Sequence, residues 1–273
     1  MAAPVPPRND QGRTMLKRIL NKIRRMKYRP AIEVEPVSGR MRRLGTAYGG
    51  KTFADDTSLY GATIISAGLG EDASFDVEFA KTYGAKVIIV DPTPRSIAYH
   101  DDLLTRAGKA AELQYGTAGR LPLESYDLVG VSGDQLPLVR KALWVNHEKQ
   151  RFYAPRNPEH VSHSIVNFQN EHREDTDYIE VESTTLEALL SAFEIGDLPL
   201  LKMDIEGAEI AVIGHMLSES SIRPKQICVE FDELAIPSLE TKHKYELLDE
   251  KLRAAGYKCT FFDGHSDYSY MLA

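Results

Sequence analysis

The sequence predicts an α/β fold with a doubly wound, mainly parallel sheet and an antiparallel hairpin at its C-terminal end. From Gly61 on, short β-branched runs alternate with stretches of helical periodicity, which is typical of a parallel sheet with helices on both faces. A glycine-rich turn follows the first run, and the dipeptide Asp263-Gly264 separates the last two. We therefore expect the last two runs to form a hairpin, with one terminal strand antiparallel to the others.

The expected elements follow one another in a regular order along the chain. Strands are expected over 62–67, 86–90, 138–145, 150–154, 200–203, 226–231, 258–262 and 268–272. The runs 138–145 and 150–154 flank an expected turn at Asn146 and His147. Helices are expected over 74–83, 96–107, 184–195 and 243–255, with a further helix directly after Glu209.

Composition and length are those of a soluble globular protein. Hydrophobic residues make up 42% of the 273 residues and charged residues 27%, which excludes extended disorder outside the chain ends. We expect a Pro-rich tail and basic helical extension over 1–45, and one domain over 46–273. No apolar run is long enough to cross a bilayer and no secretory signal is evident, so the expected location is cytoplasmic. Cys228 and Cys259 stand alone and are assigned to the core.

Charge is distributed unevenly along the chain. The net charge of -7 combines +9 over residues 1–43 with -16 over the remainder, and an acidic body argues against a nucleic-acid partner. Apolar residues recur at helical spacing over 14–29 among many lysines and arginines. Residues 13–29 could contact an anionic membrane surface or an acidic partner, giving a membrane-peripheral location. We favour the alternative that this helix packs on the domain.

The turn after the first strand has the features of a nucleotide-cofactor loop. It reads Gly68-Leu69-Gly70-Glu71-Asp72-Ala73, and Asp91 follows the second strand, 21 residues beyond Gly70. Glycines allow the backbone to approach a ligand, and an acid at this spacing accepts hydrogen bonds from a ribose. An ordinary strand-to-helix turn would explain the same residues. Glu71 and Asp72 would repel a pyrophosphate, so the loop favours S-adenosylmethionine, with its sulfonium and ammonium groups, over NAD.

The segment Leu200–Glu209, LLKMDIEGAE, carries the strongest pattern in the chain. Together with the preceding TTLEALL helix it resembles the FkbM-type family of S-adenosylmethionine-dependent methyltransferases, whose fourth strand is followed by K-x-D-x-E-G-x-E. The resemblance extends over about 58–273. One departure concerns the first loop, which usually reads like D-x-G-A-N-x-G. Here Ser66 replaces the acid and Gly70 the asparagine.

The resemblance implies a class I methyltransferase fold of the Rossmann-like type and S-adenosylmethionine as cofactor. It implies that Gly68 and Gly70 approach the cofactor and that Asp91 binds its ribose. It also implies that Asp204 and Glu206 lie at the mouth of the reaction pocket.

The residue pattern gives independent grounds for interest in Asp204. Lys202 and Asp204 share one face of the fourth strand, and a charged pair at the end of a central strand needs partners or a function. The alternative for both Asp204 and Glu206 is a structural network that holds the turn between strand and helix. Because of its charge and place in the loop, we add Asp72 to the cofactor-binding residues.

A long polar segment over 155–172 is predicted to face the substrate. It contains His160, His163 and His172 and is too long for a simple turn. His163, between two serines, is the first candidate among the histidines for a general base beside Asp204, and the alternative is a surface histidine. We assign no metal ligands. A variant in which Mg²⁺ is held by Asp204, Glu230 and Asp232 stays open.

These patterns predict an S-adenosylmethionine-dependent O-methyltransferase. The acceptor implied by the resemblance is the hydroxyl group of a sugar, a glycan or a small secondary metabolite. An NAD-dependent oxidoreductase is the enzymatic alternative. A third possibility is a non-catalytic scaffold with a methyltransferase fold, anchored by its basic N-terminal helix.

Overall fold

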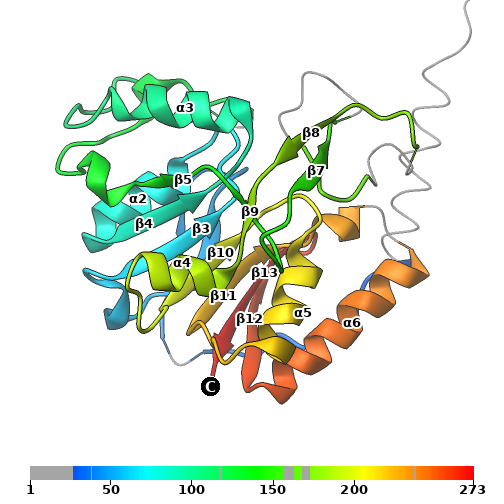
Figure 1. The fold of residues 1–273 in the computed structure, drawn as a ribbon. Helices are drawn as coiled ribbons and strands as arrows, with labels where there is room; N and C mark the ends of the chain where they lie inside the picture. Colours follow the sequence, from blue (N-terminus) through cyan, green and yellow to red (C-terminus); the bar gives the residue numbers. More distant parts are fainter. Residues whose placement is uncertain (1–26, 38, 117–118, 156–162, 168–172, 236–237) are drawn as a thin grey trace, which may run out of the picture.

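The centre of the structure, a computed structural model, is a seven-stranded sheet with strand order β12-β13-β11-β10-β3-β4-β5 (Figure 1). The described residues are 27–37, 39–116, 119–155, 163–167, 173–235 and 238–273. The strands are β3 (Thr63–Ala67), β4 (Lys86–Val90), β5 (Leu138–Val139), β10 (Leu200–Met203), β11 (Gln226–Glu230), β12 (Tyr257–Phe262) and β13 (Asp267–Leu272). Strand β13 is antiparallel to both of its neighbours, and the other pairings are parallel. The predicted fold class is confirmed.

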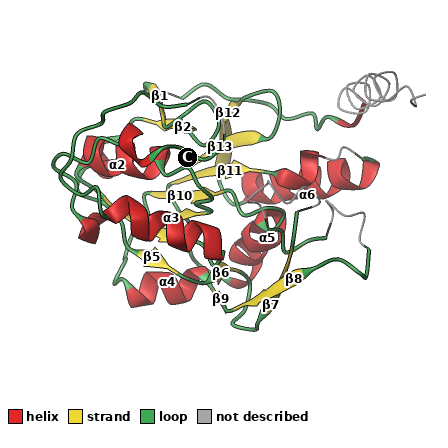
Figure 2. Ribbon diagram, turned by 90° about the horizontal axis from the view of Figure 1, so that it is seen from above, coloured by secondary structure: helices red, strands yellow, loops and turns green. Residues whose placement is uncertain are grey.

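Helices cover both faces of this sheet, and each face has its own apolar core (Figure 2). Helices α2 (Ser74–Tyr83) and α3 (Pro94–Leu104) lie over one face, where Phe79 and Leu103 join the core of Ile64 and Ile89. The opposite face is covered by α4 (Leu186–Ala192), α5 (Glu209–Glu219) and α6 (Leu239–Ala254). Alternate residues of the central strands therefore point into two different cores, which is why these strands read as continuous apolar runs.

Several elements agree with the sequence expectation residue by residue. Helix α2 and strands β4 and β10 have the predicted bounds, and Gly84 ends α2 in the left-handed conformation with φ 58°. Strand β3 differs from the expected 62–67 by one residue. In each case the apolar run and a glycine or proline at its end lie within the same few residues, so local information suffices.

Three helices begin or end away from the expected positions. Helix α4 is capped by the side chain of Thr185, which accepts from Ala188 N at 3.2 Å, because Ser183 and Thr184 form strand β9 instead. Helix α6 starts at residue 239, four residues earlier than expected, since Ser238 and Thr241 form a capping box. Helix α3 spans 94–104 rather than 96–107, with a proline in its first turn.

The strand expected over 150–154 is present over residues 150–153, whereas the strand expected over 138–145 is not continuous. The run 138–145 is split between β5, which joins the main sheet, and β6 (Ala142–Leu143), which pairs with β9 (Ser183–Thr184). Strand β7 (Gln150–Tyr153) pairs antiparallel with β8 (Tyr178–Val181). The partners β8 and β9 come from a stretch that the sequence analysis left unassigned, so the pairing had no local signal.

The C-terminal hairpin is confirmed, but its connection is longer than a two-residue turn. Four residues, 263–266, separate β12 from β13. The side chain of Asp263 organises them by accepting from His265 N at 2.7 Å and from Ser266 N at 3.1 Å. Gly264 takes the positive φ of 94° that the loop requires.

A hairpin that the sequence analysis did not predict precedes the sheet. Strands β1 (Met41–Leu44) and β2 (Lys51–Ala54) pair antiparallel, and the backbone of Ala54 bonds in both directions to the side chain of Gln226 in β11. All four residues of β2 are buried. The expected domain boundary between 45 and 46 falls in the turn of this hairpin.

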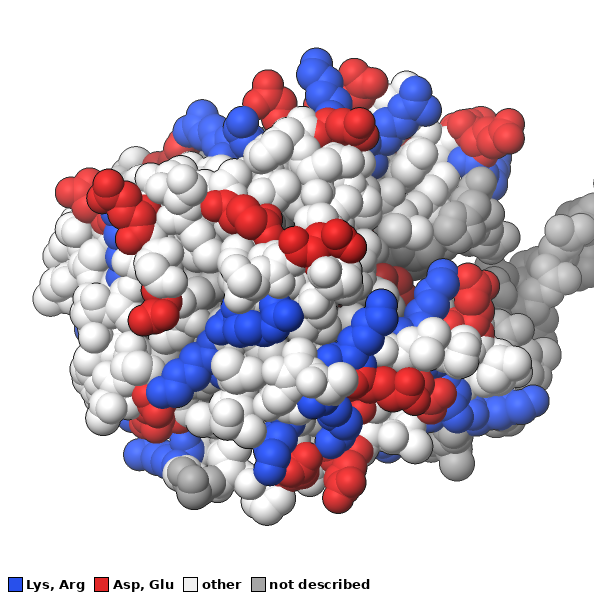
Figure 3. Space-filling model, turned by 60° about the horizontal axis from the view of Figure 1, so that its bottom comes forward, with Lys and Arg blue, Asp and Glu red and all other residues white. Residues whose placement is uncertain are grey.

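Some expectations concern the chain ends and the surface. Most of the predicted basic helix over 14–29 lies outside the described residues. Within the described part of the chain, no helix has the length and apolar character needed to cross a membrane. On the face shown in Figure 3, basic and acidic side chains are interspersed. Both cysteines are free and buried, as predicted.

Candidate active site

A cavity of about 380 Å³ opens where the parallel strands end near the centre of the sheet. It lies at the switch point between β3 and β10, from which successive strands are added in opposite directions. Open α/β sheets bind their ligands at such a point, beyond the carboxyl ends of the strands. The cavity is lined by the seven residues that the sequence analysis assigned to catalysis and cofactor binding, which are Gly68, Gly70, Asp72, Asp91, His163, Asp204 and Glu206.

Gly68 is required by the packing of two backbone segments. Its φ is +88°, and a Cβ built on it would overlap the carbonyl oxygen of Asp204. The side-chain amine of Lys202 donates a hydrogen bond to Gly68 O from the neighbouring strand. A side chain at position 68 would therefore push β3 and β10 apart at the point where the cavity begins. Gly70 also has a positive φ, of 57°.

Asp91 holds the glycine loop in place. One carboxylate oxygen accepts from Leu69 N at 2.9 Å and from Gly70 N at 3.2 Å. The other accepts from Thr93 N at 2.8 Å and from Thr93 Oγ1 at 2.6 Å. These four contacts use most of the hydrogen-bond acceptor capacity of the carboxylate. Its predicted role toward a ribose stays a prediction, and the structure adds a role in shaping the loop.

Asp72 connects the glycine loop to the N-terminal hairpin. Its carboxylate accepts from Thr46 Oγ1 at 2.6 Å and from Ser74 N at 2.9 Å. These contacts bring the hairpin turn over the loop, so that Tyr48 and Gly49 line the cavity. Sequence reasoning missed both residues, because the chain before residue 58 matched no motif.

The charge argument drawn from Glu71 needs correction. Its buried carboxylate pairs with Arg95 Nη2 at 2.9 Å and with Arg120 Nη1 at 3.1 Å. Two guanidinium groups therefore offset the negative charge that was expected to repel a pyrophosphate. The acids of this loop do not by themselves distinguish S-adenosylmethionine from NAD.

The loop after β10 presents Asp204 and Glu206 to the cavity. Glu206 has a φ of 57°, which is uncommon for a residue with a side chain. The buried carboxylate of Glu209 accepts from Ile205 N at 2.7 Å and from Gly207 N at 3.0 Å. The last acid of the DIEGAE segment thus fixes the loop that carries the first two.

Asp204 pairs with a lysine that sequence reasoning did not consider. Lys51 of β2 has its Nζ 3.4 Å from Asp204 Oδ2, whereas Lys202, the expected partner, donates to Gly68 O. Burial opposes ionisation of Asp204, but the charges of Lys51 and Lys202 hold its pKa below the usual range. Asp204 is therefore a carboxylate at neutral pH.

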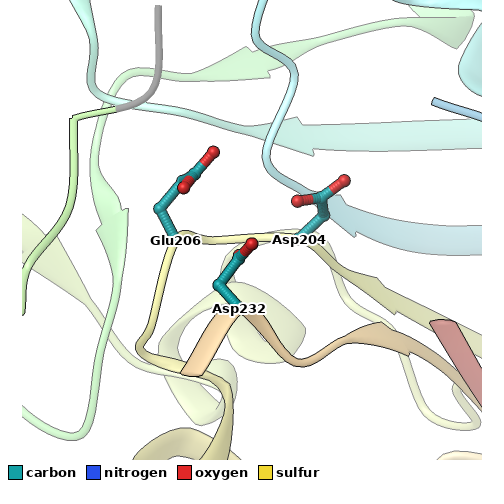
Figure 4. Close-up of side chains that lie close together, drawn as sticks. All are labelled: Asp204, Glu206 and Asp232. Atoms are coloured by element: carbon teal, nitrogen blue, oxygen red, sulfur yellow. The ribbon is translucent and has the colours of Figure 1, made fainter. Parts of the chain in front are cut away.

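Three carboxylates converge at the cavity, and two of them, Asp204 and Glu206, line it. Oxygen atoms of Asp204, Glu206 and Asp232 lie within 4.8 Å of one another, and Figure 4 shows the three side chains projecting to the same side. Burial, reinforced by the charge of Glu206, raises the pKa of Asp232 well above its usual value. The set expected for Mg²⁺ included Glu230, but its carboxylate pairs with Lys51 at 2.8 Å. We assign no metal to these acids.

His163 lies beside the loop that carries Glu206. The neighbouring Ser164 is buried, bridges to Tyr153 through its backbone, and shares its hydroxyl between Glu206 O and Val166 O. These contacts attach the segment 163–167 to the site. His160 and His172 lie outside the described residues.

A buried acid lies beneath the glycine loop. Asp76 of α2 is 1% exposed, and burial raises its pKa to about 6 although the charge of Lys202 opposes the shift. The pattern of α2 gave no reason to expect an acid on its buried face.

Comparison with known proteins identifies the family. A family model described as Methyltransferase FkbM domain matches residues 60–259. The chain belongs to the FkbM methyltransferase family. Membership confirms the resemblance seen in the sequence and implies S-adenosylmethionine as the cofactor of the FkbM domain. A search of curated proteins found no match.

Two solved structures are similar to the chain in fold. One is the methyltransferase FkbM from Methylobacillus flagellatus KT, with 11% identity and a TM-score of 0.42, covering 78% of this chain and 44% of that one. The other is an O-methyltransferase family 2 protein from Planctomyces limnophilus DSM 3776 in complex with apigenin, with 10% identity and a TM-score of 0.36, covering 99% and 63%. The chain spans less than two thirds of the length of either protein.

Replacing Asp76 by asparagine is expected to stabilise the protein at neutral pH. Because the pKa of Asp76 is raised in the folded state, this acid causes no loss of folding stability below about pH 4, where it is protonated in both the folded and the unfolded state. The loss of stability grows as the pH rises toward 6 and then stays constant at about 3 kcal/mol. Urea unfolding of both proteins from pH 4 to 8 measures it. A stability difference that does not change with pH would contradict the assignment.

Proposed function

We propose that this chain is an S-adenosylmethionine-dependent methyltransferase that methylates a hydroxyl group of a sugar, a glycan or a small secondary metabolite. The observation that carries the proposal is the position of one cavity within the FkbM domain. The glycine loop and Asp91 form one end of its lining, and Asp204 and Glu206 form the other. A donor and an acceptor bound there would lie side by side.

The glycines on the loop side of the cavity let a cofactor approach the backbone. Gly49 approaches Asp72 so closely that a Cβ would lie 2.8 Å from its carboxylate, which leaves no side chain between hairpin and loop. We assign Gly68, Gly70, Asp72 and Asp91 to cofactor binding. When bound, S-adenosylmethionine supplies an activated methyl group, so the protein has to align the acceptor and remove a proton.

Asp204 is the group best suited to take that proton. It is a carboxylate at neutral pH and lines the cavity together with Glu206. Accepting a proton from a bound hydroxyl as the methyl transfers would contribute roughly 10²- to 10⁴-fold to the rate. We assign Glu206 a catalytic role on the same side of the methyl acceptor as Asp204. If the methyl acceptor binds closer to the segment 163–167, His163 is the base instead.

The two alternatives have different standing. An NAD-dependent oxidoreductase loses support because the family model describes methyltransferases. A thermal-shift comparison of NAD with S-adenosylhomocysteine tests this alternative directly. A scaffold anchored through residues 13–29 would bind anionic liposomes without binding S-adenosylhomocysteine. We also propose that residues 41–45 belong with the catalytic domain, because they form part of the hairpin above the loop.

The reaction is tested by incubating the protein with S-adenosylmethionine and a panel of hydroxyl compounds. Sugars, oligosaccharides and polyketide-type alcohols form the panel, and mass spectrometry detects a product heavier by one methylene. Formation of S-adenosylhomocysteine in step with that product supports the proposal. If NAD stabilises the protein and S-adenosylhomocysteine does not, the proposal is wrong.

Asp91→Ala is expected to weaken cofactor binding. The variant removes every hydrogen bond that holds the loop amides of Leu69 and Gly70, and a bond to a charged group is worth about 1.5 to 3 kcal/mol, or roughly 10- to 100-fold in affinity. Calorimetric titration with S-adenosylhomocysteine measures the loss. Thr93→Val is the matched control, since it removes the hydroxyl contacts to Asp91 and Ser96 but keeps the bonds from Asp91 to the loop amides, and it should cost less. Unchanged affinity in Asp91→Ala would exclude both roles of this acid.

Asp204→Asn is expected to reduce methyl transfer while sparing cofactor affinity. Asparagine keeps the size of the side chain but cannot accept the proton, so turnover should fall roughly 10²- to 10⁴-fold. Asp55→Asn serves as the control. It removes a carboxylate at the end of the N-terminal hairpin, one that pairs with Arg42 and does not line the cavity, and its turnover should fall far less. Equal losses in both variants would assign Asp204 a structural role.

A further inference from the structure

A buried lysine from the N-terminal hairpin lies behind the acids of the site. Lys51 is 2% exposed, and its Nζ is 2.6 Å from Asp267 Oδ1, 2.8 Å from Glu230 Oε2 and 3.4 Å from Asp204 Oδ2. Asp267 and Glu230 belong to β13 and β11, and Asp204 directly follows β10, the next strand of the sheet. One ammonium group thus connects the ends of these strands. Lys51 also lies outside residues 60–259, the part that the family model matches.

The two shorter contacts fix the ammonium group in space. Glu230 and Asp267 face each other across β11 and β13 as register partners, so the lysine bridges a pair already held by the sheet. Burial alone would favour the neutral amine, but the charges of Asp204, Glu230 and Asp267 raise the pKa of Lys51 well above its ordinary value. A fixed positive charge therefore stands 3.4 Å from Asp204.

Asp204 needs this charge because acids surround it. The groups that face it are the cations Lys51 and Lys202, the acids Glu206, Glu209, Glu230, Asp232 and Asp267, and the phenol of Tyr48. Burial opposes a charge on Asp204, and so does each of these acids while it is ionised, whereas a hydrogen bond with Glu230 favours the charge. Of the two lysines, Lys202 donates to Gly68 O, whereas Lys51 is the one within ion-pair distance.

We infer that Lys51 is a positioning residue, which holds the carboxylate of Asp204 ionised and oriented at the cavity for proton removal from the acceptor. The inference rests on the proposed function. It makes the N-terminal hairpin part of the active site, although the residue itself touches neither cofactor nor acceptor.

The need to attach the N-terminal hairpin to the sheet does not explain why Lys51 is buried. The hairpin is already joined to the sheet by the bonds between Ala54 and Gln226, and to the glycine loop by Thr46 and Asp72. A buried ion pair is weak evidence for stability, since an apolar side chain of similar volume often serves as well. A charge at this position is needed for what it does to the acids nearby.

The experiment follows Asp204 directly and needs no knowledge of the acceptor. The side-chain carboxyl carbon of Asp204 is observed by ¹³C NMR in the protein bound to S-adenosylhomocysteine, and assigned by its absence in Asp204→Asn. Lys51→Met is expected to raise the pH at which Asp204 titrates by roughly 1 to 3 pH units, the effect of losing an adjacent opposite charge. Lys51→Arg keeps the charge and should restore titration near the wild-type value.

A matched control separates this role from stability. Arg42→Met removes another ion pair of the same hairpin, with Asp55 at 3.0 Å, and should leave the titration of Asp204 unchanged. Unchanged titration in a folded Lys51→Met protein overturns the inference. If Lys51→Met does not fold, the titration of Asp204 in the wild-type protein still tests the inference. A pKa of Asp204 above its ordinary value would show that Lys51 does not hold the carboxylate ionised.

The proposed function is judged by different measurements. Failure of the wild type to bind S-adenosylhomocysteine would overturn the proposed function, and the titration in the unliganded protein would still report on Lys51. Once an acceptor is found, the acid limb of the pH profile for methyl transfer should move upward in Lys51→Met and return in Lys51→Arg. A lower rate with no movement of that limb would overturn the positioning role.

Discussion

The active site depends on the close contact between two backbone segments at the centre of the sheet. The amide of Asp204 donates to Ala67 O at 3.0 Å, and that of Gly68 donates to Val90 O at 2.9 Å, so the hydrogen-bonded ladder continues beyond the strand ends. Only a residue without a Cβ fits at position 68. Beyond this contact the two backbone segments diverge, one into the glycine loop and the other into the DIEGAE loop. The contact therefore sets the separation between the cofactor loop and the acids.

The acidic character of the site makes the N-terminal hairpin necessary. Asp204, Glu230 and Asp267 lie together around Lys51, at the ends of adjacent strands. In such a cluster, burial and mutual repulsion favour neutral carboxyl groups. Burial and the charge of Asp204 accordingly raise the pKa of Glu230. The pKa of Asp204 is lowered instead, because the charges of both Lys51 and Lys202 act on it, whereas only Lys51 acts on Glu230. The hairpin supplies one of these cations and, through Tyr48, part of the cavity wall.

Much of the fold follows from the sequence, because its signals are local. An apolar run with a glycine or proline at its end defines α2, β4 and β10 within a few residues. Residues that line the cavity directly follow β4 and β10. The partners Lys51 and Tyr48 have no comparable signal. Lys51 is separated from Glu230 by 179 residues, and only the folded sheet brings them together. The pairing of β7 with β8 was not predicted for the same reason.

The glycine loop shows why charges counted along a sequence do not give the field at a site. Glu71 is acidic, yet Arg95 and Arg120, 24 and 49 residues away, neutralise it. Asp91 stands at the spacing of a ribose-binding acid. The same position is also where a hydrogen-bond acceptor must lie to hold the amides of Leu69 and Gly70. Both demands place a carboxylate at the end of the second parallel strand. The hydrogen bonds from Leu69 and Gly70 therefore account for a carboxylate at this position without a ribose.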